Sequence, residues 1–200
     1  MYHIKEDKRS KQSSNLIFNA FQSLLYEKNY SDIKITEVIE RAQVSRATFY
    51  RNYDTLEDIL RYECDQRFIA LKEYIAGYYL NQNSERNTHP LDLLKPFLRF
   101  WYLDSGIIEL LIRINNKEIL YSNISDMVKK LIDRVKSSPD KDPFYEYSLT
   151  IRSNIIMGIL EVWILNNKNV APDTLSIQVM KHLSESLKYK VDTSNGDTLH

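Results

Sequence analysis

The stretch Arg-Ala-Gln-Val-Ser-Arg-Ala-Thr-Phe-Tyr-Arg-Asn-Tyr, residues 41–53, carries the clearest structural signal in this chain. Gln43-Val44-Ser45 reads as a turn, and Ser45 is a good N-cap for a short helix over Arg46–Tyr53. The stretch holds three arginines and no carboxylate, whereas the whole chain balances 27 basic against 27 acidic side chains. A local excess of positive charge in a neutral protein predicts a surface for an anionic partner. These features favour a helix-turn-helix whose second helix enters a DNA groove.

Upstream of this stretch, apolar residues recur at three- and four-residue spacing. They predict a first amphipathic helix over about residues 8–28 and a second, short helix over about residues 35–42. Together with the helix after the turn they form a three-helix unit. We expect Val44, Phe49 and Tyr53 to point inward and hold the angle between the last two helices.

The remaining side chains of the third helix are expected at the surface, where they meet DNA. Arginine makes paired hydrogen bonds to guanine or phosphate, and hydroxyl groups make phosphate contacts that position the protein. The alternative is an ordinary solvated helix face. We expect further phosphate contacts from Lys8, Arg9 and Lys11. The predicted DNA-binding residues are Thr36, Ser45, Arg46, Ala47, Thr48, Tyr50, Arg51 and Asn52.

The rest of the chain also reads as helical, because only four glycines and five prolines interrupt it. A long fourth helix is expected to begin after Thr55 as N-cap and to reach about residue 79. Segments 81–89, 137–143 and 191–200 are polar or rich in breakers and are predicted as loops and a tail. The helices expected between them cover about residues 90–104, 107–114, 118–136 and 144–166, with a last helix from residue 172.

Several classes of protein are excluded by composition. The lone Cys64 permits no internal disulfide, and the four histidines have no metal-ligand spacing to another donor. No nucleophile–base pair and no phosphate loop is recognisable, so we expect neither an enzyme nor a catalytic residue, cofactor or metal site. No apolar stretch is expected to approach the roughly 18 residues that span a bilayer. We therefore expect no membrane contact and a cytosolic location.

The C-terminal part offers aromatic side chains for a small-molecule effector pocket, although an ordinary packed core explains them as well. The residues predicted to bind the effector are Tyr78, Phe97, Phe100, Trp101 and Tyr121.

The helix over residues 144–166 is apolar on nearly every side, so it must be covered on all sides. One side can face the core of its own subunit, and the other can pair with a second copy and with the last helix. The alternative is a core helix of a monomer. The residues predicted at the dimer interface are Ile155, Ile159, Trp163, Val179 and Leu183.

The sequence from Ile35 to Tyr53, followed by Leu56-Glu57-Asp58-Ile59-Leu60, resembles the DNA-binding domain of TetR/AcrR-family transcriptional regulators. The Ser-Arg-Ala-Thr-Phe-Tyr core, the aromatic residue at position 53 and Glu-x-Ile-Leu at the start of the fourth helix are the specific parts. A weaker resemblance, over residues 156–164 and Pro172, is to the C-terminal domain of a TetR subgroup common in low-GC Gram-positive bacteria.

This resemblance implies an all-α fold of about nine helices in a bacterial, cytoplasmic protein. It implies a DNA-binding domain over residues 1–60, with the helix-turn-helix at about 34–53, and a regulatory and dimerisation domain over residues 61–200. It also implies a homodimer that straddles a palindromic duplex operator, and an effector pocket in the C-terminal domain. The expected function is that of a repressor released from its operator by a small molecule.

Three residues depart from the family pattern. Gln43 replaces the usual turn glycine, so it must either take a positive φ or use a different turn. Lys34 replaces the threonine that caps the second helix, and Ser31, Asp32 or Thr36 is expected to substitute. Leu56 replaces a lysine that contacts phosphate. The changes at Gln43 and Leu56 motivate an alternative function, a co-regulator that binds a partner protein and has weak DNA affinity of its own.

Overall fold

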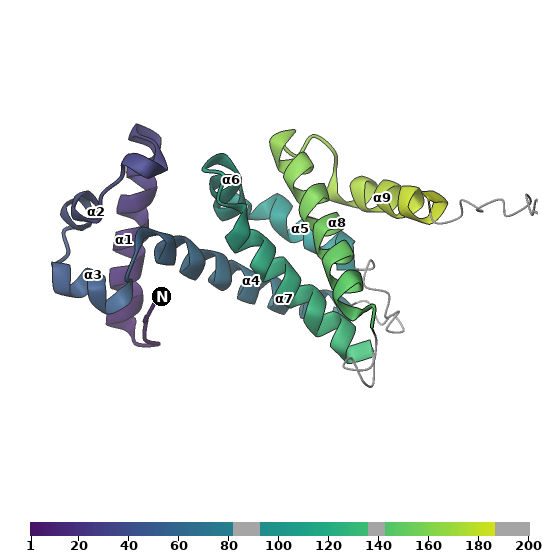
Figure 1. Ribbon diagram of the computed structural model, residues 1–200, viewed down its shortest axis with the longest axis horizontal. Helices are drawn as coiled ribbons and strands as arrows, with labels where there is room; N and C mark the ends of the chain where they lie inside the picture. Colours follow the sequence, from purple (N-terminus) through teal and green to yellow (C-terminus); the bar gives the residue numbers. More distant parts are fainter. Residues whose placement is uncertain (82–92, 136–142, 187–200) are drawn as a thin grey trace, which may run out of the picture.

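The computed structural model describes residues 1–81, 93–135 and 143–186, which form nine α-helices and one short 3-10 helix. Within these ranges the only β-type pairing is an isolated bridge between Tyr2 and Tyr53. The all-α prediction is therefore confirmed. The first three α-helices lie at one end of the molecule, α4 leads away from them, and the remaining helices gather around its far half (Figure 1).

The N-terminal end is built on α1, which packs against both α2 and α3. Asp7 caps α1, because its side chain accepts a hydrogen bond from the Ser10 amide at 2.9 Å. The predicted apolar stripe of α1 faces inward except for Leu16, which is exposed, and Ile17 and Phe21 are fully buried. The elements of this end are α1 (Lys8–Glu27), η1 (Tyr30–Asp32), α2 (Ile35–Ala42) and α3 (Arg46–Asn52).

The start of α2 differs from the sequence-based expectation. Lys34 itself occupies the cap position, and no side chain of Ser31, Asp32 or Thr36 caps the helix. Glu37 takes over part of this role, because its carboxylate accepts a hydrogen bond from the Lys34 amide at 2.8 Å. The same carboxylate pairs with the Lys28 ammonium at 2.5 Å. A carboxylate in the first turn also suits the positive end of the helix.

The long helix α4 (Leu56–Asn81) joins the two ends of the molecule. Thr55 acts as its N-cap as predicted, because its hydroxyl accepts a hydrogen bond from the Asp58 amide while the Asp58 carboxylate accepts one from the Thr55 amide. This reciprocal arrangement satisfies donors that the first helical turn leaves free. α4 contacts α1 and also α5, α6 and α7. It runs without a break through residue 60, the predicted domain boundary.

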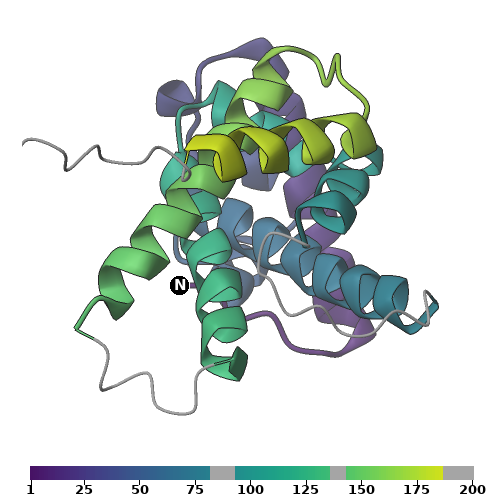
Figure 2. The same ribbon diagram turned by 90° about the vertical axis from the view of Figure 1, so that its right-hand side faces the viewer.

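The C-terminal helices form a bundle in which α7 packs against α8 and α5 against α9 (Figure 2). Arg99 of α5 holds α9 in place through two hydrogen bonds to Asp173, at 2.6 and 2.5 Å. The predicted loops and tail, and the start of a helix at Pro90, lie outside the described residues except for Asn81 and Pro143. The helices of this part are α5 (Leu94–Leu103), α6 (Gly106–Arg113), α7 (Lys117–Val135), α8 (Tyr145–Leu165) and α9 (Pro172–Ser186).

Helix α8 is long and apolar enough to cross a membrane by length and composition, and it is the one described helix of which this is true. The expectation that no segment would reach this length is therefore wrong for α8. Leu160 and Met157 of α8 are buried within the protomer, and Lys117 of α7 pairs with Glu161 at 2.5 Å. A core helix of a helical bundle meets the same criteria of length and hydropathy.

Candidate nucleic-acid interface

The turn between α2 and α3 contains Gln43, which takes the positive φ that the sequence left as one of two alternatives. Gln43 lies in the left-handed region, with φ 53° and ψ 40°. In this conformation the Gln43 amide donates to the Glu40 carbonyl and the Val44 amide donates to the Ile39 carbonyl, both at 3.2 Å. The turn therefore retains the geometry that usually requires glycine, at the conformational cost of placing a β-carbon there.

Ser45 begins α3 as predicted. Its hydroxyl oxygen accepts a hydrogen bond from the Thr48 amide at 3.0 Å, and the hydroxyl groups of Ser45 and Thr48 lie 2.8 Å apart. Phe49 and Tyr53 are fully buried, and their rings are in contact at 6.0 Å between centroids. The predicted inward face of α3 is therefore confirmed, and it fixes which side of the helix faces solvent.

Most of the predicted DNA-binding side chains lie at the surface. Thr48 is half-buried, and Tyr50, which stacks edge-on against Phe49, is 53% exposed. The exposed members of the predicted set are Thr36, Ser45, Arg46, Ala47, Tyr50 and Arg51.

Asn52 is the exception, because its side chain is buried and not available to DNA. Its amide nitrogen donates to the Thr48 carbonyl at 2.8 Å, and its amide oxygen accepts from the Ser10 hydroxyl at 3.0 Å. The Asn52 carbonyl also accepts a hydrogen bond from the His3 amide at 2.8 Å. Asn52 therefore fastens the end of α3 to the start of α1 and to the N-terminal residues.

The positive charge of this region is distributed unevenly among its arginines. Arg41 forms an ion pair with Glu27 and also donates to the Ser23 hydroxyl, so its charge is neutralised locally. Arg46 and Arg51 form no ion pair with any described carboxylate and are exposed. These two arginines are the free cations of α3.

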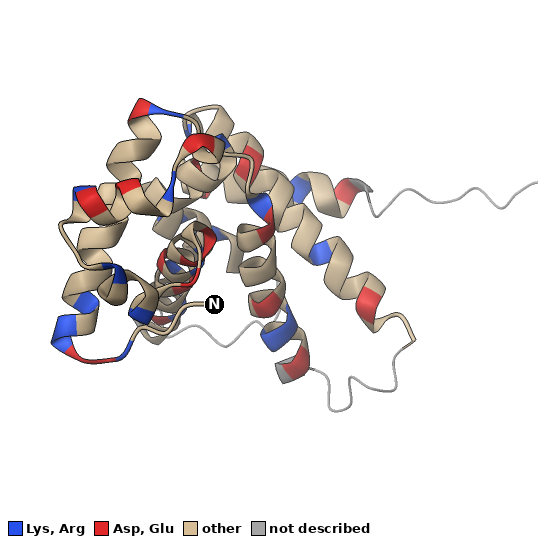
Figure 3. Ribbon diagram, turned by 60° about the vertical axis from the view of Figure 1, so that its left-hand side comes forward, with Lys and Arg blue, Asp and Glu red and all other residues tan. Residues whose placement is uncertain are grey.

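The start of α1 lies next to the end of α3, because Ser10 is hydrogen-bonded to Asn52. This segment adds further positive charge. Lys8 and Arg9 are exposed and form no ion pair within the described residues, whereas Lys11 pairs with Glu6 at 2.6 Å. Figure 3 marks the positions of Lys and Arg in blue along the ribbon. We name the exposed cations of this side the basic face. It consists of Lys8, Arg9, Arg46 and Arg51.

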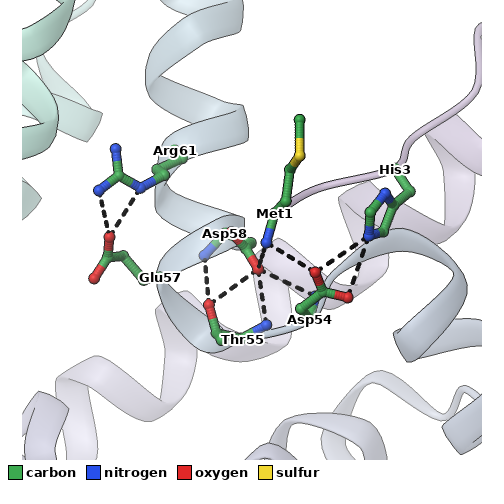
Figure 4. A network of polar contacts seen from close by, with 7 residues as sticks. All are labelled: Met1, His3, Asp54, Thr55, Glu57, Asp58 and Arg61. Carbon is green, nitrogen blue, oxygen red and sulfur yellow. Dashed lines mark hydrogen bonds and ion pairs between the residues drawn. The ribbon is translucent and has the colours of Figure 1, made fainter.

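The start of α4, where Leu56 replaces a basic residue, carries acidic side chains and the N-terminus of the chain (Figure 4). The Met1 α-amino group lies 2.9 Å from Asp54 and 2.8 Å from Asp58. His3 contacts Asp54 at 3.2 Å, and Glu57 pairs with Arg61 at 2.6 Å. Each carboxylate of this turn therefore has a partner within the protein, but three carboxylates share two cations, the Met1 amino group and Arg61.

The aromatic residues predicted to bind an effector fall into different surroundings. Trp101 and Phe97 are buried, and Phe100 contacts Trp101 edge-on at 4.9 Å. Tyr78 is half-buried, and the Arg99 guanidinium lies 5.7 Å from its ring centroid. Tyr121 of α7 is half-buried and makes no ring contact with the others among the described residues.

This aromatic cluster contains a buried hydrogen-bond donor that is unsatisfied within the described residues. The indole nitrogen of Trp101 is buried and has no hydrogen-bond partner within the described residues. A buried donor without a partner is uncommon in proteins, because its lost hydration is not replaced.

Of the residues predicted at a dimer interface, Trp163 alone is buried within the described part of the chain. Trp163 is buried, its indole nitrogen donates to the Val170 carbonyl at 2.8 Å, and its ring stacks on Tyr102. Trp163 is therefore a core residue, which corrects the prediction. Ile159 and Val179 are partly buried against the same core. Ile155 and Leu183 are half-buried.

A different stripe of α8 is exposed. Its apolar residues form two pairs near the two ends of the helix, four and three positions apart, and the exposed Asn154 and Gly158 lie between the pairs on the same side of the helix. Gly158 lies within the stripe, and a β-carbon added there would meet no atom within 4 Å. This stripe was not predicted, because the sequence of α8 is apolar on nearly every side and does not indicate which side is exposed. The exposed apolar residues of the stripe are Tyr147, Ile151, Val162 and Leu165.

The described residues contain no group of three or more side chains that could hold a metal ion. Cys64 is buried, and burial together with the Asp65 carboxylate raises the pKa of its thiol to about 12. This thiol is therefore protonated and poorly nucleophilic at neutral pH.

Comparisons with known proteins identify the fold. No protein-family model matches the chain. The HTH-type dhaKLM operon transcriptional activator DhaS of Lactococcus lactis is 28% identical over 76 residues, which cover 38% of this chain and 41% of that protein. The match therefore spans less than half of either protein.

Two solved structures resemble nearly the whole chain. Lin0861 from Listeria innocua aligns over 94% of this chain and 99% of its own, with a TM-score of 0.69 and 14% identity. A Syntrophomonas wolfei protein described as a TetR-family transcriptional regulator aligns over 92% and 99%, with a TM-score of 0.64 and 18% identity. The chain therefore has the all-α fold of TetR-family regulators, as the resemblance implied.

Proposed function

We propose that this protein is a TetR-type transcriptional regulator that binds duplex DNA through α3, and that it is not an enzyme. The observation that carries this proposal is the state of Arg46 and Arg51. Both are exposed on the second helix of a helix-turn-helix, and neither is neutralised by a described carboxylate. Such a helix can place side chains in the major groove while Lys8 and Arg9 contact phosphates. We assign this role to residues 1–60 and regulation to residues 61–200.

The active form is proposed to be a homodimer. The exposed stripe of α8 is apolar and would gain free energy from burial against a second copy. A two-fold axis there gives two α3 helices related by symmetry, which suits a palindromic operator. We expect Gly158 to permit close approach of the two α8 helices.

We further propose that a small molecule bound in the C-terminal part releases the operator, so that the protein acts as a repressor in the bacterial cytoplasm. The aromatic cluster around Trp101 suits a ligand with an apolar body. Its unpartnered indole nitrogen suits a ligand that also carries a hydrogen-bond acceptor. Such a ligand acts by favouring the conformation in which the two α3 helices no longer match the operator.

A second candidate function is that of a partner-dependent co-regulator. It is favoured by Leu56, which provides no charge for a phosphate where the family usually has lysine, and by the acidic side chains around it. The similar protein DhaS is named an activator. An activating role in this chain would involve contacts beyond the operator.

The experiment that tests DNA binding selects duplexes from a random library with the purified protein at about 50 mM salt. Arg46→Ala and Arg51→Ala should each weaken binding to the selected duplex by about tenfold, the usual loss for an arginine that contacts base or phosphate. Arg41→Ala is the matched control, because Arg41 already pairs with Glu27. It removes the same charge and should change affinity much less.

The results separate the two candidates. Enrichment of a palindromic duplex, with loss of binding in both arginine variants, supports direct operator binding. If both variants bind like the unmodified protein, α3 is not the reading helix. If no duplex is enriched even at low salt, the co-regulator function is the better description.

A further inference from the structure

The N-terminal residues 1–5, which we name the strap, run back across the junction of α3 and α4. Tyr2 forms an antiparallel bridge with Tyr53, and the His3 amide donates to the Asn52 carbonyl at 2.8 Å. Asn52 is the last residue of α3. The strap is thus joined by backbone hydrogen bonding to the end of the proposed reading helix.

The side chain of Tyr2 reaches further, to the middle of α4. Its hydroxyl donates to Oδ2 of Asp65 at 2.8 Å. Burial and the Asp65 carboxylate raise the pKa of Tyr2 to about 12, so the phenol keeps its proton at neutral pH and remains a donor.

The other oxygen of the same carboxylate faces the C-terminal bundle. Asn123 of α7 donates from its side-chain nitrogen to Oδ1 of Asp65 at 2.8 Å, and the same nitrogen lies 3.2 Å from the Ile119 carbonyl. Asp65 and Asn123 are both half-buried, which strengthens hydrogen bonds to a charged group relative to solvent-exposed ones. One carboxylate therefore holds the strap on one side and α7 on the other.

Aromatic packing makes the strap a firm connection. The ring of Tyr2 contacts Tyr62 of α4 edge-on at 5.3 Å, and Tyr62 contacts Tyr53 at 6.3 Å. Tyr53 in turn contacts Phe49 of α3. These rings form a continuous line of contacts from the strap to the inward face of α3.

We propose that Tyr2, Asp65 and Asn123 are positioning residues that couple α7 to α3 through the strap. When α7 moves, the hydrogen bond from Asn123 to Asp65 is lengthened, the carboxylate turns, and the strap loosens its hold on the end of α3. This route passes through Asp65 of α4 and involves no residue of the basic face. Its consequence for DNA depends on the proposed function, whereas the coupling itself does not.

The coupling is tested first on the purified protein without DNA, by hydrogen exchange of the His3 amide observed by NMR. Tyr2→Phe removes only the hydroxyl donor, and Asn123→Ala removes the donor on α7. Both should speed His3 exchange by about tenfold relative to the amide of Phe21, in line with the strength of a hydrogen bond to a carboxylate. The Phe21 amide of α1 corrects for any general loss of stability.

Two variants serve as matched controls. Asn166→Ala removes an asparagine that, like Asn123, donates to the carbonyl four residues earlier, at 2.8 Å, but has no cross-helix partner among the described residues. Tyr26→Phe removes a hydroxyl that makes no hydrogen bond within the described residues. Neither should alter His3 exchange. Unchanged His3 exchange in Asn123→Ala overturns the proposal, even if Tyr2→Phe speeds it, because the strap would then be held only locally.

The second measurement uses a duplex selected by the unmodified protein. Tyr2→Phe and Asn123→Ala should weaken its binding by about three- to tenfold, although neither residue belongs to the basic face. Unchanged affinity in both variants overturns the claim that the strap positions α3. If the unmodified protein selects no duplex, the proposed function fails, and the exchange measurement alone decides on the coupling.

Discussion

Two neighbouring residues of α3, Arg51 and Asn52, differ in burial. We therefore expect Asn52 to contribute to stability and Arg51 to the proposed DNA binding. Arg51 points to solvent without an ion pair among the described residues, whereas Asn52 is buried and uses both ends of its amide. Removing a buried amide leaves its hydrogen-bond partners unsatisfied, and this costs more free energy than the hydrogen bonds contribute by themselves.

We therefore expect Asn52→Ala to lower the free energy of unfolding by about 1–3 kcal/mol. Arg51→Ala should change stability by less than about 0.5 kcal/mol, as surface substitutions usually do, while weakening DNA binding. Chemical denaturation of both variants measures this difference. Equal stability of the two variants would contradict the role of Asn52 as a fastening residue.

The turn residue Gln43 gives a second prediction at this scale. At its positive φ, a residue with a β-carbon has a higher conformational energy than glycine. Gln43→Gly should therefore raise the free energy of unfolding by about 0.5–1 kcal/mol. Gln43→Ala keeps the β-carbon and should leave stability nearly unchanged. Thermal melts of the three proteins compare these effects, and a less stable glycine variant would show that the turn is not strained.

At the scale of the element, the start of α4 depends on one buried carboxylate. Asp58 accepts hydrogen bonds from the amides of Asp54 and Thr55, from the Thr55 hydroxyl and from the Met1 amino group. Burial alone would raise the pKa of Asp58, but the hydrogen bonds outweigh it and hold the pKa below its usual value. The charged form is therefore favoured by folding.

The lowered pKa of Asp58 determines how its contribution to the stability of the protein depends on pH. The stabilisation is fully present above the pKa of an unfolded aspartate, about 3.9, and is lost as pH falls through the lower folded-state value. Asp58→Asn should cost about 1–3 kcal/mol at pH 7, and its difference from the unmodified protein should shrink below about pH 4. Asp54→Asn, at an exposed position, should cost less. Urea denaturation across this pH range tests the prediction, and a pH-independent difference would contradict it.

At the scale of the whole molecule, the exposed stripe of α8 is an apolar surface that the described residues leave uncovered. Its residues Tyr147, Ile151, Val162 and Leu165 are between 59% and 69% exposed. α7 covers the opposite side of α8. This exposure is the reason for proposing the stripe as the dimer surface.

Val162→Glu should therefore weaken the proposed dimer by at least about tenfold, since a carboxylate would be buried without a partner. Leu16→Glu is the matched control, because Leu16 is an exposed apolar residue of α1, at the other end of the molecule (Figure 1). Light scattering over a range of protein concentrations measures both. A monomeric unmodified protein, or a Val162→Glu variant that dimerises equally well, would exclude this interface.

The sequence by itself determined the helices, the turn and the inward face of α3. These features depend on neighbours within a few positions. Ser45 caps the amide of Thr48, and the spacing of Phe49 and Tyr53 follows from the helical period. The sequence also singled out Gln43 as the unusual residue of this turn, but it left open whether Gln43 takes a positive φ or the turn differs, and the structure shows the positive φ.

Only the tertiary structure decided which polar and apolar side chains remain free. Asn52 is buried because Ser10 and His3, more than 40 positions away, lie against it, and Arg41 is neutralised by Glu27 of another helix. The orientation of α8 could not be read from spacing, since a helix that is apolar all round has no preferred face until its neighbours pack. Burial and charge pairing depend on partners brought together by folding, and the periodicity of one segment contains no information about them.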